Sequence, residues 1–126
     1  MAIEFIPDSG DSPLSKAVAV NGLLFTSGQV GRRADGSVPS AFVEQLEQAL
    51  LNLDALLSSA NSGLDRVVKL TAFVTADGWS TDLNETYRRF LKAPYPARTR
   101  VEVARLSPGY LVELDAIAMQ NPDESE

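Results

Sequence analysis

The sequence predicts an α+β domain in which two helices pack on one face of a β-sheet. Several short segments alternate apolar and other side chains, which is the period of a strand with one buried face. Two longer stretches repeat apolar residues every three or four positions, which is the period of an amphipathic helix. The order is strands, helix, strand, helix, two strands. This order is typical of a sheet that helices cover on one side.

The length and composition describe one domain. The chain has 126 residues, of which 44% are apolar and 22% are charged, and its net charge is −6. A domain of this size buries enough surface to form a core without disulfides or metals. We expect a single domain over residues 1–120, followed by an acidic tail over residues 121–126.

The charge and the missing residue types exclude several classes of function. Phosphate binding depends on Lys and Arg, so a chain with a pI near 4.6 is not expected to bind nucleic acid. Without Cys and His, the chain has no disulfide, no thiolate nucleophile, no Ser-His-Asp triad and no set of usual zinc ligands. Proton transfer near neutral pH must then depend on Asp, Glu, Lys, Tyr or water. The sequence shows neither an apolar run of membrane-spanning length nor a signal peptide, so we expect a cytoplasmic protein with no membrane partner.

The N-terminal quarter predicts three strands. Residues 2–6 form a short strand candidate, and the polar segment 8–13 is a loop. Two apolar segments, 17–20 and 23–27, flank Asn21-Gly22. Asn-Gly between alternating apolar residues is the strongest short-range signal for a β-hairpin.

The first helix is the clearest element. Ser40 is a plausible N-cap, and Asn61-Ser62-Gly63 is a stop signal. The apolar residues between them recur at helical spacing: Phe42, Val43, Leu46, Ala49, Leu50, Leu53, Leu56 and Leu57. Such a stripe predicts an amphipathic helix with one buried face.

A central strand and a second helix follow. The segment 66–74 is rich in β-branched and apolar residues, and 76–78 interrupts it. Thr81 can cap a helix that Pro94 and Pro96 end. One face of that helix is apolar, through Leu83, Tyr87, Phe90 and Leu91.

The last two alternating segments predict two strands. They cover residues 96–104 and 111–118, with Ser107-Pro108-Gly109 between them. Since Pro beside Gly favours a chain reversal, we expect these strands to be antiparallel neighbours. The two helices cover one face of the sheet, so we expect the other face to pack against further copies of the chain in a cyclic oligomer.

Arg98 and Glu113 on these strands are the candidate chemical groups. A guanidinium that faces a carboxylate can hold a small carboxylic acid while the carboxylate moves protons. The alternatives are a surface ion pair for Arg98 and a cross-strand salt bridge from Glu113 to Arg98 or Arg100. Asp115 shares the face of Glu113 and is assigned a structural role, paired with a strand cation.

The sequence resembles the Rid (reactive intermediate deaminase) family, also called the YjgF family. The resemblance covers residues 21–118 and rests on blocks in a fixed order: Thr26-Ser27-Gly28-Gln29-Val30, Gln45 with residues 49–53, residues 67–74, Asn84-Glu85-Thr86-Tyr87 before Phe90, Pro96-Ala97-Arg98-Thr99, and residues 112–118. It implies a chorismate-mutase-like α+β subunit with a mixed sheet. It also implies a homotrimer with ligand clefts between subunits.

The resemblance also implies an activity. Deaminating members of the family hydrolyse reactive enamines and imines, such as 2-iminobutanoate, to 2-oxo acids and ammonia, without a metal or cofactor. Arg98 matches the arginine that binds the substrate carboxylate, and Glu113 matches the carboxylate that handles the attacking water. The backbone of Ser27 and Gly28 and the side chain of Asn84 match the pocket wall. For Asn84, capping of its own helix is the alternative.

Three further positions bear on specificity. Thr99 stands where the family has Ser or Thr, Leu14 stands where many deaminases have a pocket tyrosine, and Arg100 stands where a small residue or Cys is common. Arg100 suggests that a substrate with a second anionic group is accepted. Leu14 favours an alternative function, a non-catalytic trimer that binds 2-oxo acids. A ribonuclease is a third possible function, because the basic pair Arg32-Arg33 could bind RNA. The acidic net charge of the chain and the absence of histidine disfavour it.

Overall fold

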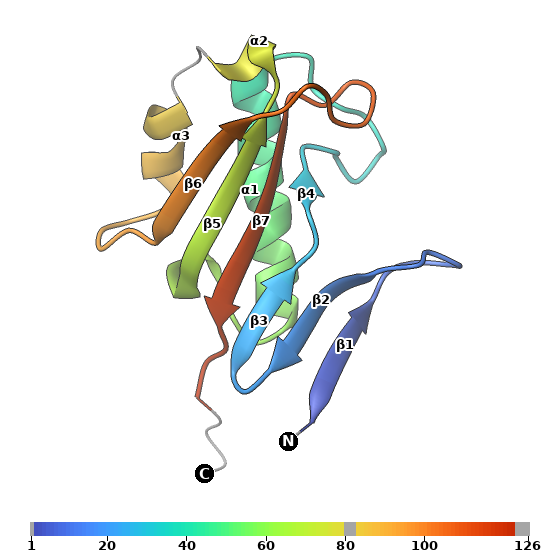
Figure 1. Ribbon diagram of the computed structural model, residues 1–126, viewed down its shortest axis with the longest axis vertical. Coiled ribbons are helices and arrows are strands. Elements are labelled where there is room, and N and C mark those ends of the chain that lie inside the picture. The colour runs from blue at the N-terminus through green and yellow to red at the C-terminus, as the bar shows by residue number, and fades with distance from the viewer. Residues whose placement is uncertain (1, 80–82, 123–126) are drawn as a thin grey trace.

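The computed structural model describes residues 2–79 and 83–122. Their strands form one mixed sheet in the order β1-β2-β3-β7-β5-β6, and β4 also pairs with β7. The long helix α1 lies across one face of this sheet, and α3 lies beside it behind the β6 edge (Figure 1). The elements are β1 (Ile3–Pro7), β2 (Ser15–Val20), β3 (Leu23–Thr26), β4 (Gln29–Val30), α1 (Phe42–Ser59), a 3-10 turn (Leu64–Arg66), β5 (Val67–Val74), α2 (Ala76–Trp79), α3 (Leu83–Phe90), β6 (Ala97–Glu102) and β7 (Val112–Met119). The predicted α+β class with two main helices on one face is confirmed.

The hairpin between β2 and β3 is confirmed at its turn. Val20 lies opposite Leu23, so Asn21 and Gly22 are the two turn residues. Their φ angles are 55° and 76°. A two-residue turn whose central residues both have positive φ suits the twist of the strands, and Asn-Gly tolerates it.

Helix α1 confirms the predicted stripe but corrects its N-cap. The N-cap residue is Ala41, which makes no side-chain hydrogen bond to the helix. The helix begins one residue later than predicted, so Ser40 lies before the position from which a side chain reaches the free N–H groups. At the other end Asn61 has a φ of 62°, and the N–H of Ser62 donates to the carbonyl of Leu57 at 2.9 Å. This 6→1 bond is a Schellman ending with Asn at the left-handed position.

The core lies between the helices and the inner face of the sheet. Buried side chains come from α1, from alternate residues of β5 and β7, and from Leu83, Tyr87 and Leu91 of the α3 region. The alternation continues through β7, where residues 112, 114, 116 and 118 are buried. The predicted cap at Thr81 and residues 123–126 of the predicted tail lie outside the described residues. No described helix combines the length and the apolar character that crossing a membrane would need.

The predicted pairing of the last two strands is wrong. β6 pairs with β5 in parallel, whereas β7 pairs with the other edge of β5 in the antiparallel sense. The chain passes from β5 through α2 and α3 to β6, which is the crossover that parallel neighbours require. Loop 103–111 then carries the chain past the end of β5, and there the N–H of Thr75 donates to the carbonyl of Leu111 at 3.0 Å. β5 therefore separates the strands of Arg98 and Glu113.

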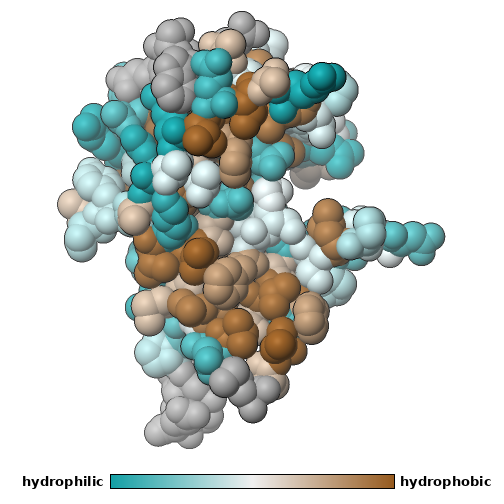
Figure 2. All heavy atoms as spheres, in the orientation of Figure 1, coloured by the Kyte–Doolittle hydropathy of each residue, from teal (hydrophilic) through white to brown (hydrophobic). Residues whose placement is uncertain are grey.

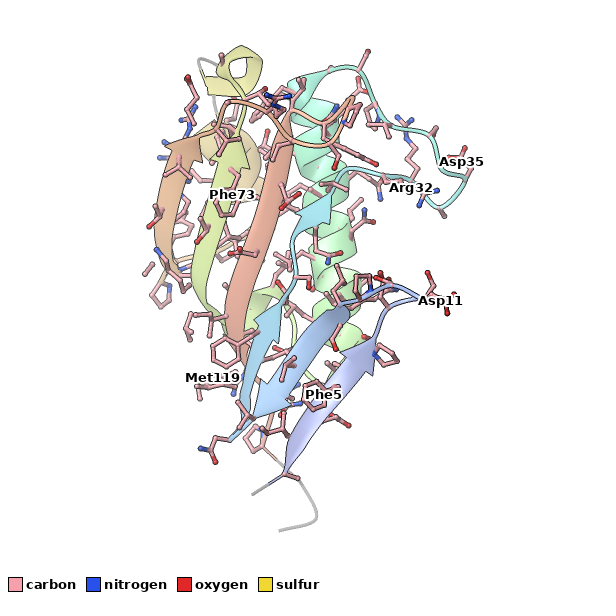
Figure 3. The ribbon with its side chains drawn as sticks, turned by 45° about the vertical axis from the view of Figure 1, so that its right-hand side comes forward. Phe5, Asp11, Arg32, Asp35, Phe73 and Met119 are labelled. Carbon is pink, nitrogen blue, oxygen red and sulfur yellow. The ribbon has the colours of Figure 1, made fainter. Side chains whose placement is uncertain are left out.

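The face of the sheet away from α1 exposes apolar side chains. Opposed residues lie on the same face, and the register joins Phe5, Val18, Phe25 and Ile117 in one row across four strands. The most exposed large apolar residues on this face are Ile3, Phe5, Phe25 and Met119. Figure 2 shows apolar side chains gathered on the lower half of this face, and Figure 3 shows Phe5, Phe73 and Met119 along it. We name it the open face.

Candidate functional site

Arg98 lies on the helix side of the sheet. It is opposite Leu70 of β5, whose side chain is buried in the core. The guanidinium carbon of Arg98 lies 4.8 Å from the ring centroid of Tyr87 on α3. This is a cation–π contact, which helps to orient the planar guanidinium. Tyr87 is only 6% exposed, so it is a rigid support.

A cavity of about 220 Å³ opens beside Arg98. It is lined by Asn84, Tyr87, Arg88, Tyr95, Pro96 and Arg98, which we name the helix-side half-site. The Tyr87 hydroxyl oxygen is buried and has no hydrogen-bond partner among the described residues. Burial raises the pKa of this hydroxyl, and the charge of Arg98 partly opposes that effect. The half-site therefore offers positive charge, an amide and a neutral hydroxyl to a small acidic ligand.

Glu113 lies on the open face, opposite Phe73 of β5. Its carboxylate lies against the backbone of Gly28. A Cβ at Gly28 would come within 2.3 Å of the Glu113 Oε2, so a larger residue there would displace the carboxylate. The glycine thus allows a backbone segment to approach the acid closely.

An extra residue in the sheet brings Gly28 to this position. Phe25 is opposite Ile117 and Gln29 is opposite Leu114, so residues 26–28 face only residues 115 and 116. One extra residue on one strand is a β-bulge, a feature frequent beside functional sites. At the bulge, the Thr26 Oγ1 takes the place of a backbone carbonyl: it accepts a hydrogen bond from the N–H of Ala116 at 3.0 Å.

The bulge also connects to the segment of Leu14. The Ser27 hydroxyl donates to the carbonyl of Ser15 at 2.6 Å, and the Ser27 N–H donates to the carbonyl of Lys16 at 2.8 Å. Leu14 is therefore adjacent in sequence to the residues that hold Ser27, and its side chain is 51% exposed. An exposed leucine at this place adds apolar surface next to the segment that holds Ser27.

The electrostatics around Glu113 favour a proton-accepting role. Burial raises the pKa of Glu113, and the nearby charge of Asp115 raises it further. Burial also raises the pKa of Asp115, opposed by a hydrogen bond from Thr71 and by the charge of Lys69. The Lys69 ammonium donates to the hydroxyl of Thr99. We name Gly28, Glu113 and Asp115 the sheet-side half-site.

The predicted site residues thus fall into two groups within one chain. Asn84 and Arg98 line the helix-side cavity. Glu113, Gly28, Ser27 and Thr99 belong to the open face or the bulge beside it. Arg100 is opposite Ala72, on the side of Arg98, but it is not among the described residues that line the cavity.

The prediction that Arg98 and Glu113 face each other within one chain therefore needs correction. Arg98 is opposite Leu70, and Glu113 is opposite Phe73. Positions 70 and 73 of β5 are an odd number of residues apart, so their side chains point to opposite faces of the strand. Residue spacing within each strand does not reveal the register between strands, which is why the pattern alone could not detect this.

The sequence interpretation missed Arg88 and Tyr95 and treated Tyr87 only as core. A signal for two of them was present. Asn84, Tyr87 and Arg88 stand at i, i+3 and i+4, and residues at those spacings share one side of a helix. Once Asn84 is a candidate, its helical neighbours are candidates too.

Comparisons with known proteins agree with this architecture. A family model described as Endoribonuclease L-PSP matches residues 9–120. The RutC family protein y4sK of Sinorhizobium fredii is 43% identical over 107 residues, which are 83% of this chain and 85% of that protein. The 2-iminobutanoate/2-iminopropanoate deaminase of Capra hircus is 37% identical over 112 residues, 87% of this chain and 82% of the deaminase.

The crystal structure of YyfA from Yersinia pestis, a protein of unknown function in the conserved Rid family, has the same fold. It superposes with a TM-score of 0.85 at 36% identity and covers 94% of this chain and 99% of that one. The family match spans most of the chain, and both the sequence relatives and the superposed structure point to the same group. The chain belongs to the Rid family, also called the YjgF or L-PSP family.

Proposed function

We propose that this chain hydrolyses reactive imines of the 2-iminobutanoate type to 2-oxo acids and ammonia, as a cytoplasmic homotrimer and without a metal or cofactor. The observation that carries the proposal is the presence of both chemical groups that the reaction needs. One is a guanidinium beside a cavity of about 220 Å³. The other is a half-buried carboxyl with a raised pKa against a glycine backbone. Relatives such as the Capra hircus protein, 37% identical, carry the name of this activity.

The proposed site is composite. Arg98 and Glu113 lie on opposite faces of one sheet, so a site that uses both must combine the helix-side half-site of one subunit with the sheet-side half-site of another. Contact between two different surfaces is heterologous, and such contacts form a closed ring when the rotation between neighbouring subunits closes. The exposed apolar side chains of the open face support burial of that face by a further subunit. A ring of three such subunits would hold three equivalent sites.

The residues would then divide the reaction between them. Arg98 binds the substrate carboxylate with its planar fork and orients the imine carbon. Glu113 accepts a proton from water as the water oxygen bonds to that carbon, and the imine nitrogen takes a proton from solvent. Glu113 then returns its proton to the amine as the carbon–nitrogen bond breaks, and the hydroxyl oxygen releases its proton to solvent as it becomes the carbonyl, which leaves a 2-oxo acid and ammonia. One water is consumed, and no oxidant or reductant is involved.

The test is hydrolysis of 2-iminobutanoate made in situ, with ammonia release measured with and without protein. We expect the wild-type chain to accelerate release and Glu113→Gln to lower kcat by about 100-fold or more, which is typical for loss of a general base. Absence of acceleration by the wild type would refute the deaminase. Thermal stabilisation by 2-oxobutanoate without turnover would instead support the 2-oxo-acid-binding alternative that Leu14 favours.

The pH dependence provides a second prediction. Glu113 works as a base only when it is ionised, so activity should rise with pH through its pKa, above the ordinary value of 4.5. Asp115→Asn removes the like charge that contributes to this shift. The acid limb of kcat/KM should therefore move to lower pH, while burial, the larger cause, keeps it above the ordinary value. Asp65→Asn, an exposed change in the 3-10 turn, is the control, and an equal shift in both variants would contradict the assignment.

A further inference from the structure

We propose that the helix-side half-site selects substrates with two anionic groups, with Arg98 on the 2-carboxylate and Arg88 on a second carboxylate. The substrate class is then the imines of acidic amino acids, such as those formed from aspartate or glutamate. The inference rests on the proposed function and specifies its substrate. It assigns a specificity role to Arg88.

Arg88 and Arg98 line one cavity from different elements, α3 and β6. Neither forms an ion pair with any residue of 2–79 or 83–122. By contrast, Arg89 contacts Glu47 at 2.7 Å, and Arg33 contacts Glu44 at 3.8 Å. Two guanidiniums beside one cavity repel each other, and a dianion between them relieves that repulsion.

The charge distribution around the cavity strengthens this conclusion. The chain carries 17 acidic and 11 basic residues, yet none of the cavity's described lining residues is acidic. Two arginines at one cavity, neither with an ion-pair partner among the described residues, give that cavity a local positive potential that attracts anions. The cavity is therefore suited to an acidic ligand, although the net charge of the whole chain is negative.

The size and the neutral groups of the cavity favour a small metabolite. A volume of about 220 Å³ is below the range of pockets for drug-sized ligands. Asn84 supplies an amide, and the buried Tyr87 hydroxyl lacks a partner among the described residues. A compact diacid with an imine or oxo group could use these neutral partners in addition to the two cations.

The structure assigns this role to Arg88 and not to Arg100, the residue that the sequence suggested. Arg100 is two residues beyond Arg98 on the same side of β6, but it does not line the described cavity wall. Arg88 lies one helical turn beyond Asn84, on the surface that faces the cavity. A second carboxylate of a ligand on Arg98 therefore meets Arg88.

The test compares kcat/KM for two imines made in situ, one from aspartate and one from 2-aminobutanoate. The wild type should prefer the diacid imine, and Arg88→Gln should lower the diacid-to-monoacid ratio by about 10- to 100-fold, the value of a charged hydrogen bond. The matched control is Arg89→Gln, the adjacent arginine on the same helix, whose guanidinium is held by Glu47. It should leave the ratio unchanged. A ratio that is the same in the wild type and Arg88→Gln would overturn the inference.

A binding measurement keeps this test separate from the proposed function. If the wild type hydrolyses neither imine, the proposed function fails, and calorimetry with 2-oxoglutarate and 2-oxobutanoate decides the inference. Tighter binding of 2-oxoglutarate that weakens in Arg88→Gln supports the two-cation site. Equal affinities for the two acids refute it.

Discussion

Replacing Arg98 by alanine is expected to lower kcat/KM for imine hydrolysis by about 100- to 1,000-fold, the cost of truncating one partner of a buried charge pair. The substrate carboxylate would lose its bidentate partner and its orientation. Arg98→Lys keeps the charge but loses the planar fork that stacks on Tyr87, so it should restore only part of the rate. Ammonia release under single-substrate conditions measures both variants.

The fold should survive this change. Arg98 makes no ion pair with a described residue, and its contact with Tyr87 is a cation–π contact, so circular dichroism and the oligomer mass should match the wild type. Full activity in Arg98→Ala would contradict the mechanism.

Mixed assemblies of the proposed trimer test whether the site is composite. Arg98→Ala and Glu113→Gln subunits are each expected to lose about 100-fold or more of the activity in the proposed mechanism. If each site takes Arg98 from one subunit and Glu113 from its neighbour, random mixing of equal amounts should restore about one quarter of the sites in a cyclic assembly. If both residues act within one subunit, mixing restores nothing. The experiment requires dissociation and reassembly, and wild-type protein treated in the same way is its control.

Replacing Gln45 by leucine is expected to lower the free energy of unfolding by about 3 kcal/mol, because three backbone groups would lose their buried partner. The Gln45 side chain is 0% exposed. Its amide nitrogen donates to the carbonyls of Pro39 at 2.7 Å and Gly109 at 2.8 Å. Its amide oxygen accepts the N–H of Leu111 at 2.8 Å. One amide thus holds two loops against α1, and one of these loops leads into β7 and Glu113.

Urea unfolding at a fixed protein concentration measures this change, because the apparent stability of the proposed oligomer would depend on concentration. The matched control is Gln48→Leu on the same helix. Gln48 is half-buried, and its amide nitrogen donates to the Asn52 Oδ1 at 2.9 Å, so its loss should cost no more than about 1 kcal/mol. Equal losses in the two variants would show that the buried amide has no special role.

Local elements were predictable because their causes are local. The stripe of α1 and the Asn21-Gly22 turn depend on residues within a few positions of one another, and both are observed. The helix start differed by one residue: Ala41 occupies the N-cap position, and the helix begins at Phe42, whose side chain is buried in the core. The predicted stop at Asn61-Ser62-Gly63 agrees with the observed end of α1, where Asn61 has a positive φ.

Strand pairing was not predictable from the same pattern. Alternation along β6 and β7 indicates which residues share a face within each strand, but it does not name the neighbouring strand. The apolar segment β5 forms hydrogen bonds along both edges and lies between them. The close contact of Gly28 with Glu113 likewise depends on a bulge that appears only when β3 and β4 are both aligned on β7.

The order of residues along this chain determined the helices, the turn and the identity of the chemical groups, because each depends on side-chain type and short-range spacing. The register of β5 with β6 and β7 decided which groups share a surface. A shift of one residue reverses the direction of a strand side chain, so Arg98 and Glu113 lie on opposite faces although both belong to neighbours of one strand. Burial of alternate apolar residues on one face of the sheet selects that register, and this burial exists only in the folded sheet.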